Sequence, residues 1–129
     1  MTNLPNPKKE RGYDLEKRTA LFGESIITLA KRIPKTIVTI PIISQMVRAG
    51  TSVGANYCEA DDAESKKDFV HKIGICKKEA RESGHWLRMV ATACPELKED
   101  LRPLWQEAKE LNLIFQRDFT ENSALVIGV

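Results

Sequence analysis

Basic side chains at helical spacing are the clearest chemical feature of this chain. From Phe69 to Cys94, apolar or small residues recur at alternating steps of four and three, which is typical of one buried helix face. At 100° per residue, six basic side chains fall together on the outward side. This set, called the basic stripe, comprises Lys67, His71, Lys78, Arg81, His85 and Arg88. It extends about 30 Å at 1.5 Å per residue. Such a row can follow a phosphate backbone, and the alternative is a solvated helix face.

The same segment offers little for metal or catalytic chemistry. Asp68 with His71, and Glu82 with His85, have the carboxylate-x-x-His spacing of di-iron bundles. Such a centre needs these pairs on two facing helices, whereas here both lie on one helix with outward histidines. Gly50-Thr-Ser-Val-Gly54 matches the G-x-S-x-G pattern, but it lies inside a predicted helix with no strand before it, unlike a nucleophile elbow. The sequence has no P-loop and no C-x-x-C motif. We therefore predict no metal, no cofactor, no catalytic residue and no small-molecule substrate.

Two further pairs of residues indicate contacts between helices. Gly50 and Gly54 lie inside a helical segment, where each glycine costs about 1 kcal/mol relative to alanine. We expect close approach of another helix to offset that cost. Ile75 and Trp86 fall outside the predicted core face, so we expect an exposed indole beside Ile75. Because exposed apolar patches mark interfaces, these two residues predict a homo-oligomer contact.

Four amphipathic helices must position these residues. Apolar spacing predicts helices from Asp14 to Ile33, from about Pro41 to the acidic turn at residues 61–64, from Ser65 to Cys94, and beyond Pro95. The β-branched run 36–41 has no partner strand and is interpreted as a connector. The inward residues of the last helix are Leu101, Leu104, Ala108, Leu111, Phe115 and Phe119. The expected fold is an all-α, antiparallel up-and-down four-helix bundle over residues 14–122, with a flexible arm at 1–13 and an apolar tail at 123–129.

Composition places the chain among single-domain globular proteins. It has 129 residues, of which 42% are hydrophobic and 29% charged, with a net charge of +2. Residues 1–36 and 66–94 each carry a net charge of +4, whereas residues 37–65 and 95–129 each carry −3. No window reaches the roughly 18 apolar residues of a membrane span. The three cysteines have no disulfide pattern and are interpreted as buried hydrophobes, which favours a cytoplasmic protein.

Three motifs in order resemble a known family. They are Tyr13-Asp-Leu-Glu-Lys-Arg-Thr19, Arg48-Ala-Gly-Thr-Ser-Val-Gly-Ala-Asn-Tyr-Cys-Glu-Ala60, and Ser65-Lys-Lys-Asp-Phe-Val-His-Lys-Ile73 with its continuation Lys78-Glu-Ala-Arg-Glu-Ser-Gly-His-Trp-Leu87. Over about residues 13–120 the chain resembles bacterial four-helix-bundle proteins encoded in intervening sequences of 23S ribosomal RNA genes. It is also similar to the accessory variability proteins of diversity-generating retroelements, which form pentameric barrels and bind nucleic acid. The resemblance implies a bundle that assembles into a ring, typically a pentamer, and leaves the biochemical role open.

Two functional hypotheses follow. The first is a non-enzymatic, ring-forming bundle that binds structured RNA or another nucleic acid through its basic helix faces. The alternative is an oligomeric scaffold whose acidic second and fourth helices bind the basic surface of a protein partner.

Overall fold

Four long helices account for most of the described backbone. The computed structural model describes the backbone of residues 7–126 and the side chains of residues 15–124 and 126. The elements in chain order are α1 (Pro7–Ala30), α2 (Thr39–Asp61), α3 (Lys66–Ala93), the short 3-10 helix η1 (Pro95–Leu97) and α4 (Lys98–Val126). This part of the chain contains no strand, and the predicted all-α four-helix bundle is confirmed.

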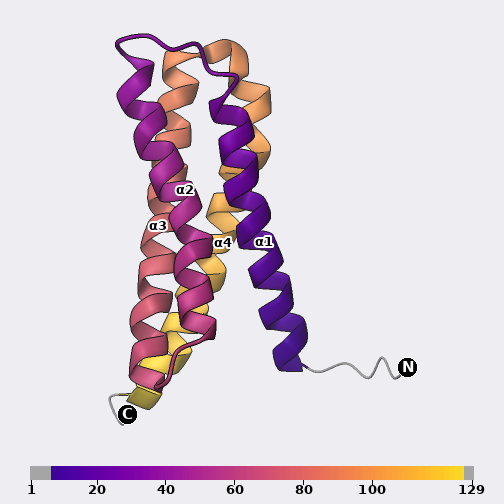
Figure 1. The fold of residues 1–129 in the computed structure, drawn as a ribbon, viewed down its shortest axis with the longest axis vertical. Coiled ribbons are helices and arrows are strands. Elements are labelled where there is room, and N and C mark those ends of the chain that lie inside the picture. The colour runs from indigo at the N-terminus through magenta and orange to yellow at the C-terminus, as the bar shows by residue number, and fades with distance from the viewer. Residues whose placement is uncertain (1–6, 127–129) are drawn as a thin grey trace, which may run out of the picture.

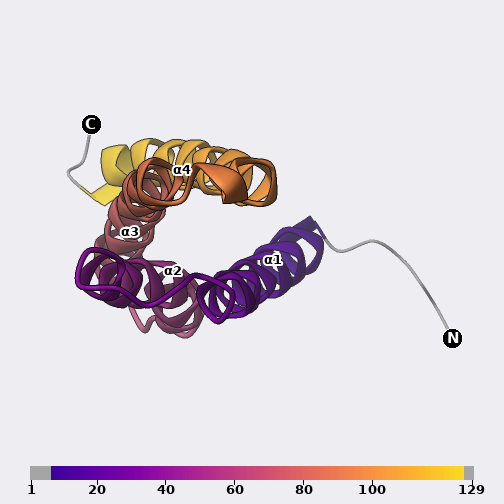
Figure 2. The ribbon, with the colours of Figure 1, turned by 90° about the horizontal axis from the view of Figure 1, so that it is seen from above.

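Consecutive helices run antiparallel and pack in chain order (Figure 1). α3 is the central element because it packs extensively against both α2 and α4, whereas α1 packs mainly against α2. Seen from above, the helices follow an arc whose two ends are α1 and α4 (Figure 2). Contacts between α1 and α4 are the sparsest of the four neighbouring helix pairs. The bundle is therefore tight from α2 to α4 and loosely closed between α1 and α4.

The first helix begins earlier than predicted. The sequence predicts a helix start at Asp14, after an arm, but α1 begins at Pro7. Proline suits the first turn of a helix because it lacks an N–H that would have no helical partner there. The following Lys8-Lys9-Glu10-Arg11 are good helix formers. The helix start predicted at Asp14 was therefore wrong. Residues 1–6 of the predicted arm lie outside the described residues.

The last helix also passes its predicted end. Residues 123–126, predicted as the start of a separate tail, continue α4. No glycine or proline interrupts the chain between Pro103 and Gly128, so nothing in the sequence forces the helix to stop at Asn122. Residues 127–129, the rest of the predicted tail, lie outside the described residues.

Hydroxyl side chains fix the starts of α2 and α3. The backbone N–H of Thr36 donates to Oγ1 of Thr39 at 2.8 Å, and the N–H of Thr39 donates to Oγ1 of Thr36 at 3.1 Å. These reciprocal bonds hold residues 36–38 as a turn, as the predicted connector requires. Residues 39–41, which were predicted as part of the same connector, instead form the first turn of α2. Ser65 is the N-cap of α3, as predicted, and its hydroxyl accepts the N–H of Asp68 at 3.0 Å.

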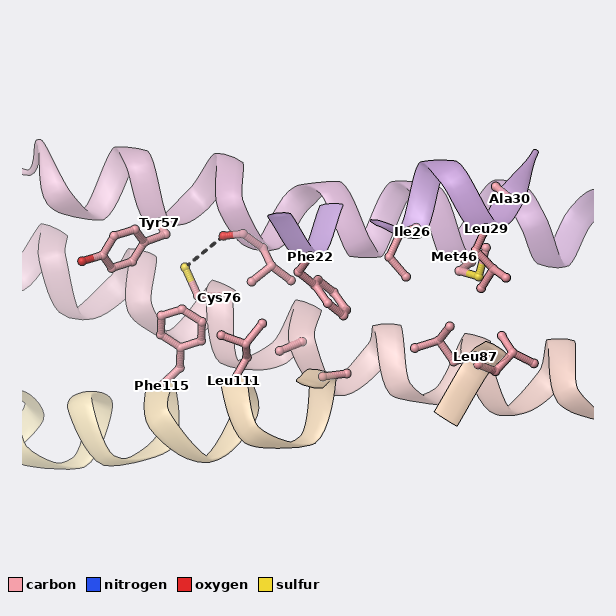
Figure 3. Packing of buried hydrophobic residues seen from close by; sticks show 14 of the residues in the cluster. Phe22, Ile26, Leu29, Ala30, Met46, Tyr57, Cys76, Leu87, Leu111 and Phe115 are labelled. Carbon is pink, nitrogen blue, oxygen red and sulfur yellow. Dashed lines mark hydrogen bonds between the residues drawn. The ribbon is translucent and has the colours of Figure 1, made fainter. Parts of the chain in front are cut away.

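The core contains nearly every residue that the periodicity selects. Figure 3 shows buried side chains of all four helices converging, among them Phe22, Met46, Leu87 and Phe115. On α3 the predicted face is buried throughout except at Phe69, which is only half-buried. The core face of α3 therefore points towards α2 and α4, and the basic stripe is turned away from it.

Two of the three cysteines are core residues. Cys76 and Cys94 are buried, and Sγ of Cys76 donates to the carbonyl of Val53 at 3.6 Å (Figure 3). Burial raises the pKa of the Cys76 thiol to about 12, so it stays protonated. Cys58 is exposed, and its predicted burial was wrong. The adjacent Tyr57 points into the core. Because successive helical residues are 100° apart, Cys58 is turned away from the core.

The contact between α1 and α2 depends on small residues. A Cβ atom added to Gly50 would lie 2.8 Å from Cγ1 of Ile26, and one added to Gly54 would lie 3.3 Å from the backbone of Thr19. Gly23 on α1, which the sequence did not single out, lies against Thr51. The two predicted glycines therefore border α1 at close approach.

Candidate nucleic-acid interface

The basic stripe lies on the outer face of α3. All six of its side chains are exposed, from Lys67 near the start of the helix to Arg88 near its end. α3 is continuous between these two residues, so the stripe is straight and about 30 Å long. Its position follows from packing, because the opposite face of α3 is held in the core by α2 and α4.

Several cations outside the stripe have carboxylate partners. Arg18 of α1 forms a bidentate pair with Glu107 of α4, with its closer N–O distance at 2.7 Å. Arg32, two residues past the end of α1, pairs with Asp100 of α4 at 3.3 Å. Lys72 of α3 lies on the side facing α2, and it donates to Glu59 at 2.9 Å. This hydrogen bond raises the pKa of the Lys72 ammonium, and the charge of Glu59 adds to the effect.

A further basic residue, Arg48 of α2, is held by two carboxylates of α3. Its guanidinium pairs with Glu79 at 3.1 Å and with Glu82. Glu79 and Glu82 of α3 are thus turned towards α2, away from the stripe. In the described part of the chain, no carboxylate lies within 4.0 Å of the charged nitrogens of Lys67, Lys78, Arg81 or Arg88. Four cations of the stripe are therefore available to an external anion.

A groove beside the stripe separates α3 from α4. It encloses about 450 Å³, and its lining includes Lys77, Lys78 and Arg81 of α3 with Asn112 and Phe119 of α4. Asn112 donates to the carbonyl of Lys77 at 2.9 Å, which fixes the two helices at this level. The ammonium of Lys77 lies 4.7 Å from the centre of the Phe119 ring, a cation–π distance. No carboxylate lines this groove.

A second hollow continues the same side of the molecule towards the start of α4. It encloses about 280 Å³ and is lined by Leu87, Arg88, Ala91, Lys98, Leu101, Arg102 and Trp105. Arg88 of the stripe thus shares this hollow with two cations of α4. The sequence prediction missed Lys98, Arg102 and Trp105. Their signal is the spacing 98, 102, 105, 109, 112 and 116, one face of α4 that carries no acid.

The two histidines of the stripe are surface residues. The imidazole of His85 packs edge-on against the indole of Trp86, with ring centres 4.9 Å apart. Among the described residues, no group of three His, Cys, Asp or Glu side chains could hold a metal ion. The stripe therefore offers cationic and aromatic chemistry suited to phosphates and bases.

The chain is similar to proteins of one known family. Residues 13–117, most of the sequence, match the 23S rRNA-intervening sequence protein family. The chain belongs to this family. It is also similar to a solved structure, a protein of unknown function from the S23 ribosomal protein family of Bacteroides thetaiotaomicron. The two share 27% sequence identity with a TM-score of 0.73, over 81% of this chain and 97% of the other. No protein of curated function matches the chain.

The two residues predicted as an oligomer contact are less exposed than expected. Ile75 and Trp86 are both half-buried, and Trp86 packs against the core. Its indole N–H donates to Glu82 at 3.0 Å. The expectation of a freely exposed indole was therefore wrong, because the Arg48–Glu82 pair covers that side of α3. Large apolar side chains are instead exposed on α1, in the α1–α2 connection, at the start of α2 and on α4: Leu21, Ile27, Ile37, Val38, Ile40, Trp105, Leu113 and Val126.

The described helices are unlike membrane-spanning helices. Within the described residues, none of them combines the length and the apolar character that crossing a bilayer requires.

Proposed function

We propose that this family member is a cytoplasmic, non-enzymatic RNA-binding protein that binds structured RNA through the basic stripe of α3. The observation that carries the proposal is the set of four exposed stripe cations without a carboxylate partner among the described residues. Arg18, Arg48 and Lys72 face a neighbouring helix and pair with its carboxylates, whereas these four cations have no such pair. A surface of this kind attracts phosphates because each contact releases condensed counterions.

The dependence of affinity on salt tests the proposal. Four phosphate contacts by Lys67, Lys78, Arg81 and Arg88 predict a log–log slope of about −3.6 per subunit on a duplex. Exchanging Lys78 and Arg81 for glutamate leaves two contacts and a slope of about −1.8 at most. All sequences should weaken alike, because phosphate contacts carry no base information.

The control exchanges two other exposed cations, Lys31 and Lys35, which lie on the α1–α2 connection. This variant changes net charge equally but leaves the stripe intact, so its affinity and slope should stay near those of the wild type. Equal slopes of log affinity against log salt for all three proteins would show that the stripe does not bind RNA. Competition by an excess of RNA duplex, DNA or protein then decides between a nucleic-acid partner and the alternative protein scaffold.

We further propose that the subunits assemble into a ring, most simply a homopentamer, as do the accessory variability proteins of diversity-generating retroelements, which we propose as relatives. Support comes from Leu21 and Ile27 on α1 and Leu113 on α4, large apolar side chains exposed on the two end helices of the arc. A ring would present several stripes to one RNA and gain affinity by avidity. Sedimentation equilibrium should give five times the subunit mass of 14.5 kDa, and a monomer at micromolar concentration would contradict the ring.

A further inference from the structure

The hollow around Trp105 combines an apolar floor with a cationic rim. Leu87 and Leu101 are almost fully buried beneath it, and Trp105 forms one wall with 41% of its surface exposed. Three cations, Arg88, Lys98 and Arg102, complete the lining, and no carboxylate does. A volume of about 280 Å³ lies just below the usual range of small-molecule pockets, roughly 300–1,000 Å³. The hollow therefore suits one flat ring system with negative charge beside it.

The neighbours of the Trp105 indole leave the hollow open. The ammonium of Lys109 lies 5.0 Å from the centre of the Trp105 ring. Lys109 does not line the hollow, so this cation leaves the hollow side of the indole open. Arg102 pairs with Glu99 at 3.1 Å, but both side chains are well exposed and such pairs contribute little. No carboxylate of the described residues pairs with Arg88 or Lys98.

We propose that this hollow holds one unpaired RNA base stacked on Trp105, while Arg88, Lys98 and Arg102 contact the neighbouring phosphates. The inference rests on the proposed RNA binding and specifies which nucleotides are bound. A duplex keeps its bases stacked inside, and only loops, bulges and single strands offer a free base face. Because Arg88 belongs to both the stripe and the hollow, a phosphate backbone that follows the stripe passes the indole. The preferred ligand is therefore RNA with an unpaired nucleotide next to a helical segment.

Two variants of Trp105 test the stacking. Base stacking on an aromatic side chain is worth about 5- to 150-fold in affinity by alanine substitution. Trp105→Ala should therefore bind a single-stranded oligouridine more weakly by such a factor and leave the affinity for a blunt RNA duplex unchanged. Trp105→Phe retains a ring and should recover part of the loss. The matched control is Ile37→Ala, which truncates an exposed apolar side chain in the α1–α2 connection, outside the hollow and the proposed ring contact, and should change neither affinity.

Tryptophan fluorescence of the wild-type protein is a second test of base stacking on Trp105. Only Trp86 and Trp105 carry an indole, so oligouridine should quench part of the tryptophan emission of the wild type. That quenched part should be missing in Trp105→Phe. Wild-type affinity retained by Trp105→Ala, or no quenching of the wild type on binding, would overturn the hollow alone. A change of assembly mass in Trp105→Ala with unchanged affinity would make the hollow a contact between subunits instead. Failure of the wild type to bind either probe would overturn the proposed function itself.

Discussion

Replacing Gly50 with alanine tests the close contact between α1 and α2. The new Cβ would lie 2.8 Å from Cγ1 of Ile26, closer than real Cβ atoms approach, and 3.0 Å from its Cγ2, which is also a tight contact. Ile26 is fully buried, so its side chain cannot move into solvent to relieve the contact. Overpacking of this kind costs about 1–3 kcal/mol. Alanine also gains about 1 kcal/mol over glycine inside a helix. The net loss in the free energy of unfolding is then about 0–2 kcal/mol.

The same exchange at Gly84 separates these two effects. There the nearest atom to the new Cβ is Cβ of Ala108 at 3.9 Å, an ordinary van der Waals contact. Gly84→Ala should therefore keep the helical gain of about 1 kcal/mol with no steric cost. Since the helical gain cancels between the two variants, their stabilities should differ by the overpacking cost of about 1–3 kcal/mol.

Urea unfolding followed by far-UV circular dichroism measures this difference. All variants must be compared at one subunit concentration, because self-association adds to apparent stability. The reasoning predicts a lower midpoint for Gly50→Ala than for Gly84→Ala, and a still lower one for Gly54→Leu, whose Cβ meets backbone of Thr19 that cannot rotate away. A Gly50→Ala midpoint equal to or above that of Gly84→Ala would refute the close contact.

Three further outcomes are expected. Ser65→Ala removes the cap of α3 and should cost about 1 kcal/mol in urea unfolding, because the N–H of Asp68 loses its acceptor. Burial, with nearby acids, raises the pKa of Tyr57 to about 12, above its ordinary value of 10.0. The protonated phenol then stabilises the fold fully below pH 10 and is lost as a stabiliser as pH rises towards 12, so Tyr57→Phe should flatten the alkaline loss of stability. A thiol reagent should modify Cys58 in the folded protein but neither Cys76 nor Cys94 until urea is added, as mass spectrometry would show.

The periodicity of the sequence was sufficient to predict the four helices and most of their buried faces. Its success on α3 has a physical cause, since this helix packs against two others and its buried face must repeat without a break. The ends of the helical region were less predictable. Pro7 reads equally well as part of a loose arm or as the first residue of a helix, and the decision depends on the helix formers that follow it.

Contacts between side chains of different helices were the part that the sequence could not specify. Angular position alone placed Trp86 outside the core and therefore exposed. In the structure, Arg48 reaches across from α2 to Glu82, and the indole donates to the same carboxylate. The hollow at Trp105 was missed for a related reason. Its walls come from two helices, and their relative rotation is set by core packing and not by either helix alone.

Net charge counted along the chain also conceals how the charges are arranged. The last segment carries −3, and this motivated the alternative in which acidic helices bind a basic partner. Two of its acids, Asp100 and Glu107, are instead paired with Arg32 and Arg18 across the loose side of the bundle. The opposite side of α4 lines both hollows and contributes no acid to either. Carboxylates thus close the bundle at α1, and the α3–α4 side is left cationic. This separation favours an anionic partner for the α3–α4 side, although the net charge of the chain is close to zero.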